Sequence, residues 1–238
     1  AKPFFLACGF TKPHLPWHVP RKYFDLHPLD KIELPKTLIN DREDLPVFGK
    51  KLAQEVHDVS GPRNFAKHGE DHDMVLKYNQ WHRAVQSYLA TISFVDFHVG
   101  RLLQALQKSE HARNTIIVLW GDHGWHLGEK QHWRKHALWE TTTRTTLIIS
   151  APDQFQKNQL CQSPVSLIDL YPTIVELCSL PARKGLDGQS IVPLLQNPKR
   201  KWIRPVLTTF GKGNHAVRTQ RWRYIRYHDG GEELYDHY

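Results

Sequence analysis

Runs of apolar residues without polar alternation predict strands that are buried on both faces of a sheet. Three such runs span residues 3–10, 114–120 and 145–151. Between the first two runs, apolar side chains from Trp81 to Leu106 recur at steps of three and four residues, which predicts a long amphipathic helix. Strands that alternate with a helix favour an α/β sheet, whose functional loops follow the ends of strands.

The segments that connect these elements are more polar. Residues 11–20 contain prolines, which lack a backbone donor and restrict the preceding residue, so this segment predicts a stiff loop. Residues 22–73 have weak periodicity and predict a long irregular insertion with one short helix. Near its end, Asp71 or Asp73 is placed to cap the long helix that follows.

The last third of the chain predicts shorter elements. Residues 169–177 have the pattern of a short helix, and residues 185–195 that of a turn followed by a helix. The arginine-rich tail has the pattern of β-hairpins, with Gly230 and Gly231 supplying a tight turn.

Together these patterns predict an α/β fold with a mixed central sheet and helices on both of its faces. A small antiparallel β subdomain is expected at the C-terminus. The simplest division places residues 1–180 in the α/β domain and residues 181–238 in the subdomain.

Composition sets limits on the ligand and the environment. Lysine and arginine exceed aspartate and glutamate by 32 to 24, which fits an anionic ligand. No nucleic-acid recognition motif appears, and no apolar run approaches the roughly 20 residues of a membrane helix, so neither partner is expected. Three cysteines are too few for a disulfide framework, although they leave one pair open.

The stretch "WGDHGWHLGEKQHWRKHALWE", residues 120–140, holds the densest chemistry. Asp122 and His123 directly follow a predicted strand and are flanked by Gly121 and Gly124, which permit close approach of a ligand. Two interpretations stay open: a pair of ligand-binding side chains, or a capping aspartate beside a half-buried histidine.

A metal ion is one candidate ligand of this stretch. Its histidines do not have the HExxH spacing and no cysteine is near, so zinc is disfavoured. A site built from Asp122 and other carboxylates would favour calcium or magnesium.

Cationic side chains that follow predicted strands are candidates to bind an anion: Lys12, His14, Arg134 and Lys135. An imidazole such as that of His14 can also supply a proton to a leaving group. The alternative is that each of these cations is solvated surface.

Several motifs, in consecutive order over nearly the whole chain, resemble one family. They are "FFLACGFTKPHLPW", "WGDHGWHLGEKQHWRK", "SLIDLYPTIVELCSLP", "GLDGQSIVPLL" and "RWRYIRYHDGGEELYD". They are similar to the sulfatase family of the alkaline-phosphatase-like superfamily, and most similar to iduronate-2-sulfatase-like members. The resemblance implies hydrolysis of sulfate esters on a sulfated carbohydrate such as a glycosaminoglycan. It also favours a secreted, periplasmic or lysosomal location.

The resemblance further implies roles for individual residues. Asp122 and His123 would be ligands of Ca²⁺, or of Mg²⁺ as in some relatives. His14 would bind the sulfate and help to protonate the leaving alcohol, with Lys12 beside it as a sulfate or substrate contact. Lys135 would bind a sulfate oxygen and stabilise developing negative charge.

One departure from the family pattern concerns the nucleophile. The family uses a formylglycine made from a Cys/Ser-x-Pro-x-Arg motif near the N-terminus, which we do not find at that place. We therefore expect no nucleophile in this chain. The missing segment would belong to the same gene or to a separate chain, and residues 1–238 alone would be inactive. The "SLPAR" of residues 179–183 matches literally but lies after the Asp-His-Gly turn, so we expect a helix-ending loop there.

Two other functions remain open on the sequence alone. The same basic residues, without a nucleophile, would suit a non-catalytic protein that binds sulfated glycans. The same fold would also suit a phosphoesterase or phosphonate hydrolase.

Overall fold

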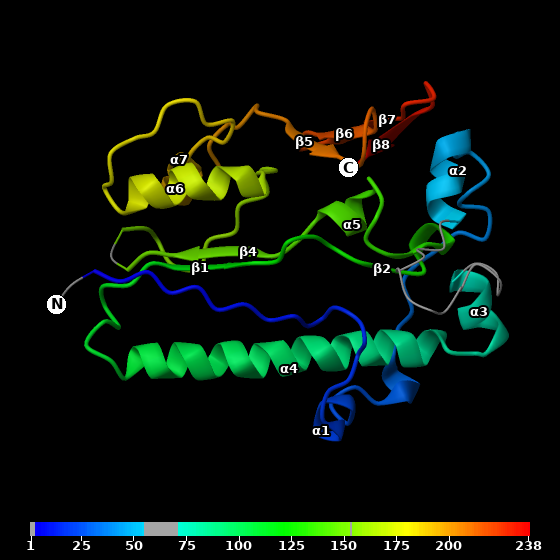
Figure 1. The fold of residues 1–238 in the computed structure, drawn as a ribbon, viewed down its shortest axis with the longest axis horizontal. Coiled ribbons are helices and arrows are strands. Elements are labelled where there is room, and N and C mark those ends of the chain that lie inside the picture. Colours follow the sequence, from blue (N-terminus) through cyan, green and yellow to red (C-terminus); the bar gives the residue numbers. More distant parts are fainter. Residues whose placement is uncertain (1–2, 55–70, 153) are drawn as a thin grey trace. The chain divides into compact units, whose positions relative to one another are not determined.

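A computed structural model of the protein describes residues 3–54, 71–152 and 154–238 (Figure 1). The chain forms two compact units. The first unit comprises Ala1–Lys36 and His72–Ala112, and the second comprises Thr37–Asp71 and Arg113–Tyr238. The two units are defined by spatial contacts and do not test the predicted domain boundary at residue 180, which stays a prediction.

The first unit is built on the long helix α4, Trp81–Gln107, which confirms the helix predicted from the apolar spacing. The short helix α1, Arg21–Phe24, packs against it through the buried Tyr23 ring, which makes edge contacts with Phe94 and Phe97. These contacts explain why α4 carries aromatic residues along one of its faces.

The predicted cap of this helix was wrong. Gln80 occupies the cap position of α4 and makes no side-chain capping bond. Asp71 and Asp73 lie instead in a separate helix, α3, Asp71–Lys77. The expectation of one short helix in residues 22–73 was also too low, because η1 (Leu29–Lys31) and α2 (Val47–Gln54) form within this segment. Residues 55–70 of the segment lie outside the described residues.

The strand expected at residues 3–10 was wrong. The structure shows no strand there, and Phe5 and Leu6 are 85% and 74% exposed. An apolar run records a preference for burial, whereas a strand also needs a hydrogen-bonded neighbour, which sequence periodicity does not identify.

The other two predicted strands are confirmed in the second unit. β1, Ile117–Trp120, and β4, Leu147–Ser150, pair antiparallel, with Val118 opposite Ile149 (Figure 1). These two strands form the part of the expected central sheet that the described residues contain. Trp120, which closes β1, is half exposed.

The segment between β1 and β4 holds the densest chemistry of the chain. It consists of short elements: β2 (His126–Leu127), η3 (Glu129–Gln131), β3 (Trp133–Arg134) and α5 (Glu140–Thr143).

The predicted C-terminal helices and β-hairpins are confirmed. η4 (Leu167–Asp169), α6 (Leu170–Leu177) and α7 (Val192–Gln196) precede a four-stranded antiparallel sheet. Its strands follow chain order: β5 (Val206–Thr209), β6 (His215–Arg218), β7 (Trp222–Arg226) and β8 (Glu232–Asp236). Gly230, with φ of 87°, lies in the turn between β7 and β8, in a conformation that favours glycine.

The core of the second unit joins the C-terminal sheet to the chain just after the candidate site. Its buried members come from α2 and the residue two positions before it, from residues 137–139, from β6 and β7, and from the residue directly after β7: Leu45, Leu52, Ala53, Ala137, Leu138, Trp139, Ala216, Ile225 and Tyr227. Because burial of apolar side chains is the main stabilising contribution to folding, residues 137–139 are held in place by the same core as the sheet.

Replacing Ile225 by alanine should lower the free energy of unfolding by about 2–5 kcal/mol, because its side chain is fully buried in this core. Leu207, in β5 of the same sheet, is 60% exposed, so Leu207→Ala should change stability by no more than about 0.5 kcal/mol. Urea unfolding followed by tryptophan fluorescence measures both. Equal losses in the two variants would contradict the assignment of the core.

Candidate functional site

The Gly121–Gly124 turn that follows β1 is fixed by close backbone packing. Gly124 and Trp125 donate their amides to the carbonyl oxygens of Thr142 and Thr141, at 2.9 and 3.0 Å. A Cβ atom at Gly124 would lie 1.9 Å from the Thr141 oxygen, so only glycine fits there. The turn therefore presents Asp122 and His123 from a backbone that has little freedom.

The hydrogen bonds of His123 determine which of its nitrogen atoms can bind a ligand. Nδ1 lies 2.7 Å from the carbonyl oxygen of Gly124, which only accepts, so Nδ1 carries the proton in the neutral ring. Nε2 then keeps its lone pair and lies 3.4 Å from Oδ2 of Asp122. A backbone carbonyl that orients a histidine in this way is a common feature of metal ligands.

The spacing of these two donor atoms is compatible with a shared cation. Calcium bonds to protein oxygens are about 2.3–2.6 Å long, so two ligand atoms at right angles lie about 3.4 Å apart. The Asp122 side chain is 85% exposed and thus accessible. Within residues 3–54, 71–152 and 154–238 no group of three or more His, Cys, Asp or Glu side chains could hold a metal ion. Asp122 and His123 stay predicted cation ligands, and by themselves they would make up only part of a coordination sphere.

Lys135 follows a tightly wound hairpin. Four residues from the end of β2 to the end of β3 have positive φ: Gly128, Lys130, Gln131 and Arg134, whose φ is 73°. Arg134 is held there by an ion pair of 2.9 Å with Asp71. Left-handed conformations of residues other than glycine are costly and often occur at functional sites. Lys135 comes next and is half-buried, and the described residues contain no carboxylate that forms an ion pair with it.

Lys12 and His14 lie in the first unit, on the proline-rich loop. The Lys12 ammonium donates to the carbonyl oxygen of Pro16, and Nδ1 of His14 lies 2.7 Å from the carbonyl oxygen of Leu15. His14 is exposed and Lys12 half-buried. Because Asp122, His123 and Lys135 belong to the second unit, a common pocket of all five residues stays a prediction.

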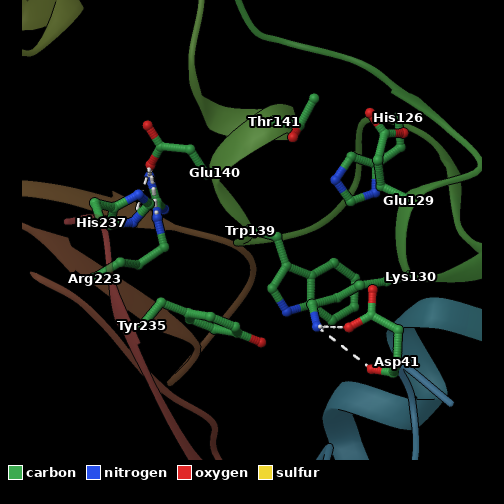
Figure 2. Close-up of a pocket in the computed structure, with 10 residues that line it drawn as sticks. All are labelled: Asp41, His126, Glu129, Lys130, Trp139, Glu140, Thr141, Arg223, Tyr235 and His237. Atoms are coloured by element: carbon green, nitrogen blue, oxygen red, sulfur yellow. Dashed lines mark hydrogen bonds and ion pairs between the residues drawn. The ribbon is translucent and has the colours of Figure 1, made fainter. Parts of the chain in front are cut away.

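Sequence reasoning missed a cavity of about 260 Å³ in the second unit (Figure 2). Its lining comes from three distant parts of the chain: Asp41, His126, Glu129, Lys130, Trp139, Glu140, Thr141, Arg223, Tyr235 and His237. Its lysine and arginine are already paired with carboxylates. Lys130 lies 3.0 Å from Asp41 and near the faces of Trp139 and Tyr235, and Arg223 binds Glu140. One feature of the sequence could have indicated the cavity: the Asp-His-Gly stretch and the arginine-rich hairpin each belong to a motif that resembles the sulfatase family.

Two histidines of the Asp-His-Gly stretch are buried beside this cavity. His126 and His132 are each 1% exposed, their Nδ1 atoms lie 3.1 Å apart, and His126 stacks on Trp139. Burial, aided by the nearby charge of Lys130, lowers the pKa of His126 to about 3. Burial also raises the pKa of Glu129, against a hydrogen bond from the Leu127 amide that lowers it.

Two glutamates, Glu140 and Glu233, join residues 139–140 to the C-terminal sheet through hydrogen bonds. The Glu140 carboxylate accepts from Arg218 Nε at 3.0 Å and from Arg223 Nη2 at 2.6 Å. The buried Glu233 accepts from Trp139 Nε1 at 2.8 Å and from the Tyr227 hydroxyl at 2.5 Å. Burial and the Glu233 charge raise the pKa of Tyr227 above its usual value, so its hydroxyl remains a donor.

The "SLPAR" match lies in a loop that ends a helix, as predicted. α6 ends at Leu177, Cys178 occupies the cap position, and Ser179 has a left-handed φ of 53°. All three cysteines, Cys8, Cys161 and Cys178, are free and exposed in the structure. Cys178 therefore lies at a helix end on the surface.

Similarity to solved structures establishes the fold. A phosphonate monoester hydrolase from Silicibacter pomeroyi superposes with a TM-score of 0.77 at 24% identity, covering 94% of this chain and 48% of that one. A protein solved in complex with its substrate D-glucosamine-2-N,6-O-disulfate superposes with a TM-score of 0.67 at 21% identity, covering 94% of this chain and 57% of that one. The class of protein defined by the fold is alkaline-phosphatase-like, with an antiparallel C-terminal subdomain.

Sequence comparison assigns the family within that class. The Sulfatase family model matches residues 1–180, and the model of the N-sulphoglucosamine sulphohydrolase C-terminal region matches residues 128–238. The chain belongs to the sulfatase family.

Individual relatives agree with this assignment. A sulfatase of Formosa agariphila is 41% identical, over 99% of this chain and 44% of its own length. Iduronate 2-sulfatase of Homo sapiens is 31% identical, over 76% of this chain and 36% of its own length. The chain thus spans less than half the length of these curated relatives. Among the described residues, no helix is both long and apolar enough to cross a membrane.

The lowered pKa of His126 predicts a pH dependence of stability. Between pH 6.5 and about 3 the unfolded chain binds a proton at this residue that the folded chain does not, so stability falls as the pH falls. From pH 7 to pH 5 the loss due to His126 should be on the order of 2 kcal/mol.

His126→Gln should remove this part of the pH dependence. Urea unfolding at pH 7 and pH 5 measures it, with the exposed His18→Gln as a matched control. An unchanged difference between the two pH values in His126→Gln would show that His126 does not contribute to it.

Proposed function

We propose that this chain is part of a sulfatase that hydrolyses sulfate esters of a sulfated carbohydrate. The observation that supports this most directly is the arrangement at Asp122 and His123. Their oxygen and nitrogen donor atoms lie 3.4 Å apart, and the His123 tautomer is set by the Gly124 carbonyl. Family membership over residues 1–180 supports the reaction class.

Sulfatases are generally metal-dependent, and in the described part of the chain Asp122 and His123 are our candidate cation ligands. We propose that the cation is Ca²⁺, with Mg²⁺ as the alternative, because carboxylate oxygens favour hard cations. When bound, such an ion would neutralise charge on sulfate oxygens and polarise the sulfur for attack. The fixed backbone of the turn would keep both ligands in place without reorganisation.

The cationic side chains would act on the sulfate and the leaving group. Lys135 would bind a sulfate oxygen, and no carboxylate of the described residues competes for its ammonium group. His14 would bind the sulfate and donate a proton to the oxygen of the leaving sugar hydroxyl, with Lys12 contacting the sulfate or substrate. These roles require that the loop of the first unit approach the turn of the second.

The nucleophile in this proposal is a formylglycine carried by a segment outside residues 1–238, in the same gene or in a separate chain. One hydroxyl of its hydrated, gem-diol form would attack sulfur and give up its proton to solvent. The sulfur–oxygen bond to the sugar would break, and the leaving sugar oxygen would take a proton from His14. A sulfated carbohydrate is the proposed substrate because one structural relative was solved with a disulfated glucosamine and another is described as a 2-O glycosaminoglycan sulfatase.

Activity of the protein expressed from its complete reading frame tests the proposal. His14→Ala and Lys135→Ala should each lower the kcat for arylsulfate hydrolysis by at least about 100-fold, through loss of the proton donor and of charge stabilisation. His18→Ala in the same loop and Lys212→Ala at an exposed site are matched controls that should retain activity. Unaltered rates in both test variants would refute the proposal.

The isolated 238-residue chain should show no turnover of arylsulfates and only weak cation affinity, because two ligands fall short of the six to eight that calcium takes. Calorimetric titration with Ca²⁺ and a sulfate-release assay measure the two properties. Substantial turnover by this chain would contradict the assignment of the nucleophile to another segment.

A further inference from the structure

The turn that carries Asp122 and His123 packs against a segment with little structure of its own. α5 is a single helical turn, Glu140–Thr143, and helices of this length are not stable by themselves. Its carbonyl oxygens at Thr141 and Thr142 accept the Trp125 and Gly124 amides. The position of the turn therefore depends on what holds α5.

Two arginines of the C-terminal sheet hold the first residue of α5. Arg223 donates to the Glu140 carboxylate from Nε and Nη2, at 3.1 and 2.6 Å, and Arg218 donates from Nε at 3.0 Å. Arg223 also donates to the Leu138 carbonyl oxygen at 2.7 Å. The Arg223 side chain is 5% exposed and that of Arg218 17%, so these bonds are shielded from water.

The Glu140 carboxylate in turn stabilises the placement of the two arginines. Arg218 in β6 lies directly opposite Arg223 in β7, and like charges in that position repel. Burial works to raise the pKa of Glu140, but the hydrogen bonds and charges of Arg223 and Arg218 outweigh it and lower the pKa. Glu140 is thus ionised at neutral pH and neutralises the repulsion between the arginines.

We infer that Glu140, held by Arg218 and Arg223, is the positioning residue of the cation site at Asp122 and His123. This inference rests on the proposed function, in which these two residues bind the cation. The carboxylate fixes α5, the α5 carbonyl oxygens fix Gly124 and Trp125, and the Gly124 carbonyl orients the His123 ring.

The connection joins parts of the chain that are far apart in sequence. Glu140 and Arg223 are 83 residues apart. The C-terminal sheet would therefore control the affinity of a site to which it contributes no ligand. Replacing a residue that supports a metal ligand typically costs about 10–100-fold in metal affinity.

Hydrogen exchange tests the inference without any metal. In Glu140→Gln, in the protein from its complete reading frame, the Gly124 and Trp125 amides should exchange about tenfold faster or more. Asp236→Asn, which breaks the exposed ion pair with Arg221 in the same sheet, should leave both amides unchanged. Unchanged protection of these amides in folded Glu140→Gln would overturn the inference.

Terbium binding tests the consequence for the site. Tb³⁺ substitutes for Ca²⁺, and the Trp125 ring, stacked 6.3 Å from the His123 ring, is placed to sensitise its luminescence. Glu140→Gln and Arg223→Lys should weaken Tb³⁺ binding about tenfold or more, and Asp236→Asn should not. Asp122→Asn should abolish binding.

The two proposals fail in different ways in this experiment. Full Tb³⁺ binding by Asp122→Asn would refute the cation site of the proposed function. Loss of binding in Asp122→Asn with unchanged affinity in Glu140→Gln would refute only the positioning role. If Glu140→Gln and Arg223→Lys do not fold, Arg218→Lys keeps the charge and removes the Nε bond to Glu140. Unchanged exchange of the Gly124 and Trp125 amides in that variant would then overturn the inference.

Discussion

A partly buried carboxylate shared by two arginines is the interaction on which the second unit depends. Trp139 and Glu140 enter the same face of the C-terminal sheet, where Trp139 donates to Glu233 and Glu140 accepts from Arg218 and Arg223. Buried charges are tolerated only when they are paired and hydrogen-bonded. Residues 137–140 cannot leave the sheet without exposing the core and leaving several charged groups without partners, so core packing and electrostatics fix the same segment.

This constraint explains how a glycine-containing turn presents the two predicted cation ligands from an ordered backbone. The Asp122–His123 turn has two glycines, which would give it freedom in isolation. In the folded unit Gly124 instead allows the backbone to approach the Thr141 and Thr142 carbonyls closely, and these contacts restrict the conformation of the turn. The proposed cation binding would then come from two side chains, of which one has its tautomer fixed by the backbone.

The sequence predicted the elements whose signal is local. The spacing of apolar residues located α4, and unbroken apolar runs located β1 and β4, because periodicity reflects burial within one element. The run at residues 3–10 is also apolar but forms no strand, since pairing depends on distant neighbours. The Asp122–His123 pair was found from its place after a strand. The Glu140 cluster was missed, because its arginines lie 78 and 83 residues further on and nothing local marks them as partners.

The position of Arg218 opposite Arg223 also has a consequence for folding of the sheet. Side chains alternate between the two faces of a strand, so a slip of β7 by one residue would turn Arg223 and Ile225 outward and bring Trp222 and Tyr224 inward. Glu140 would then lose Arg223 and face aromatic rings of β7 in its place, although Arg218 of β6 would stay. The Glu140 carboxylate therefore favours the correct strand register. Only the correctly paired sheet binds α5 through both arginines, and the conformation of the Asp122–His123 turn depends on that contact.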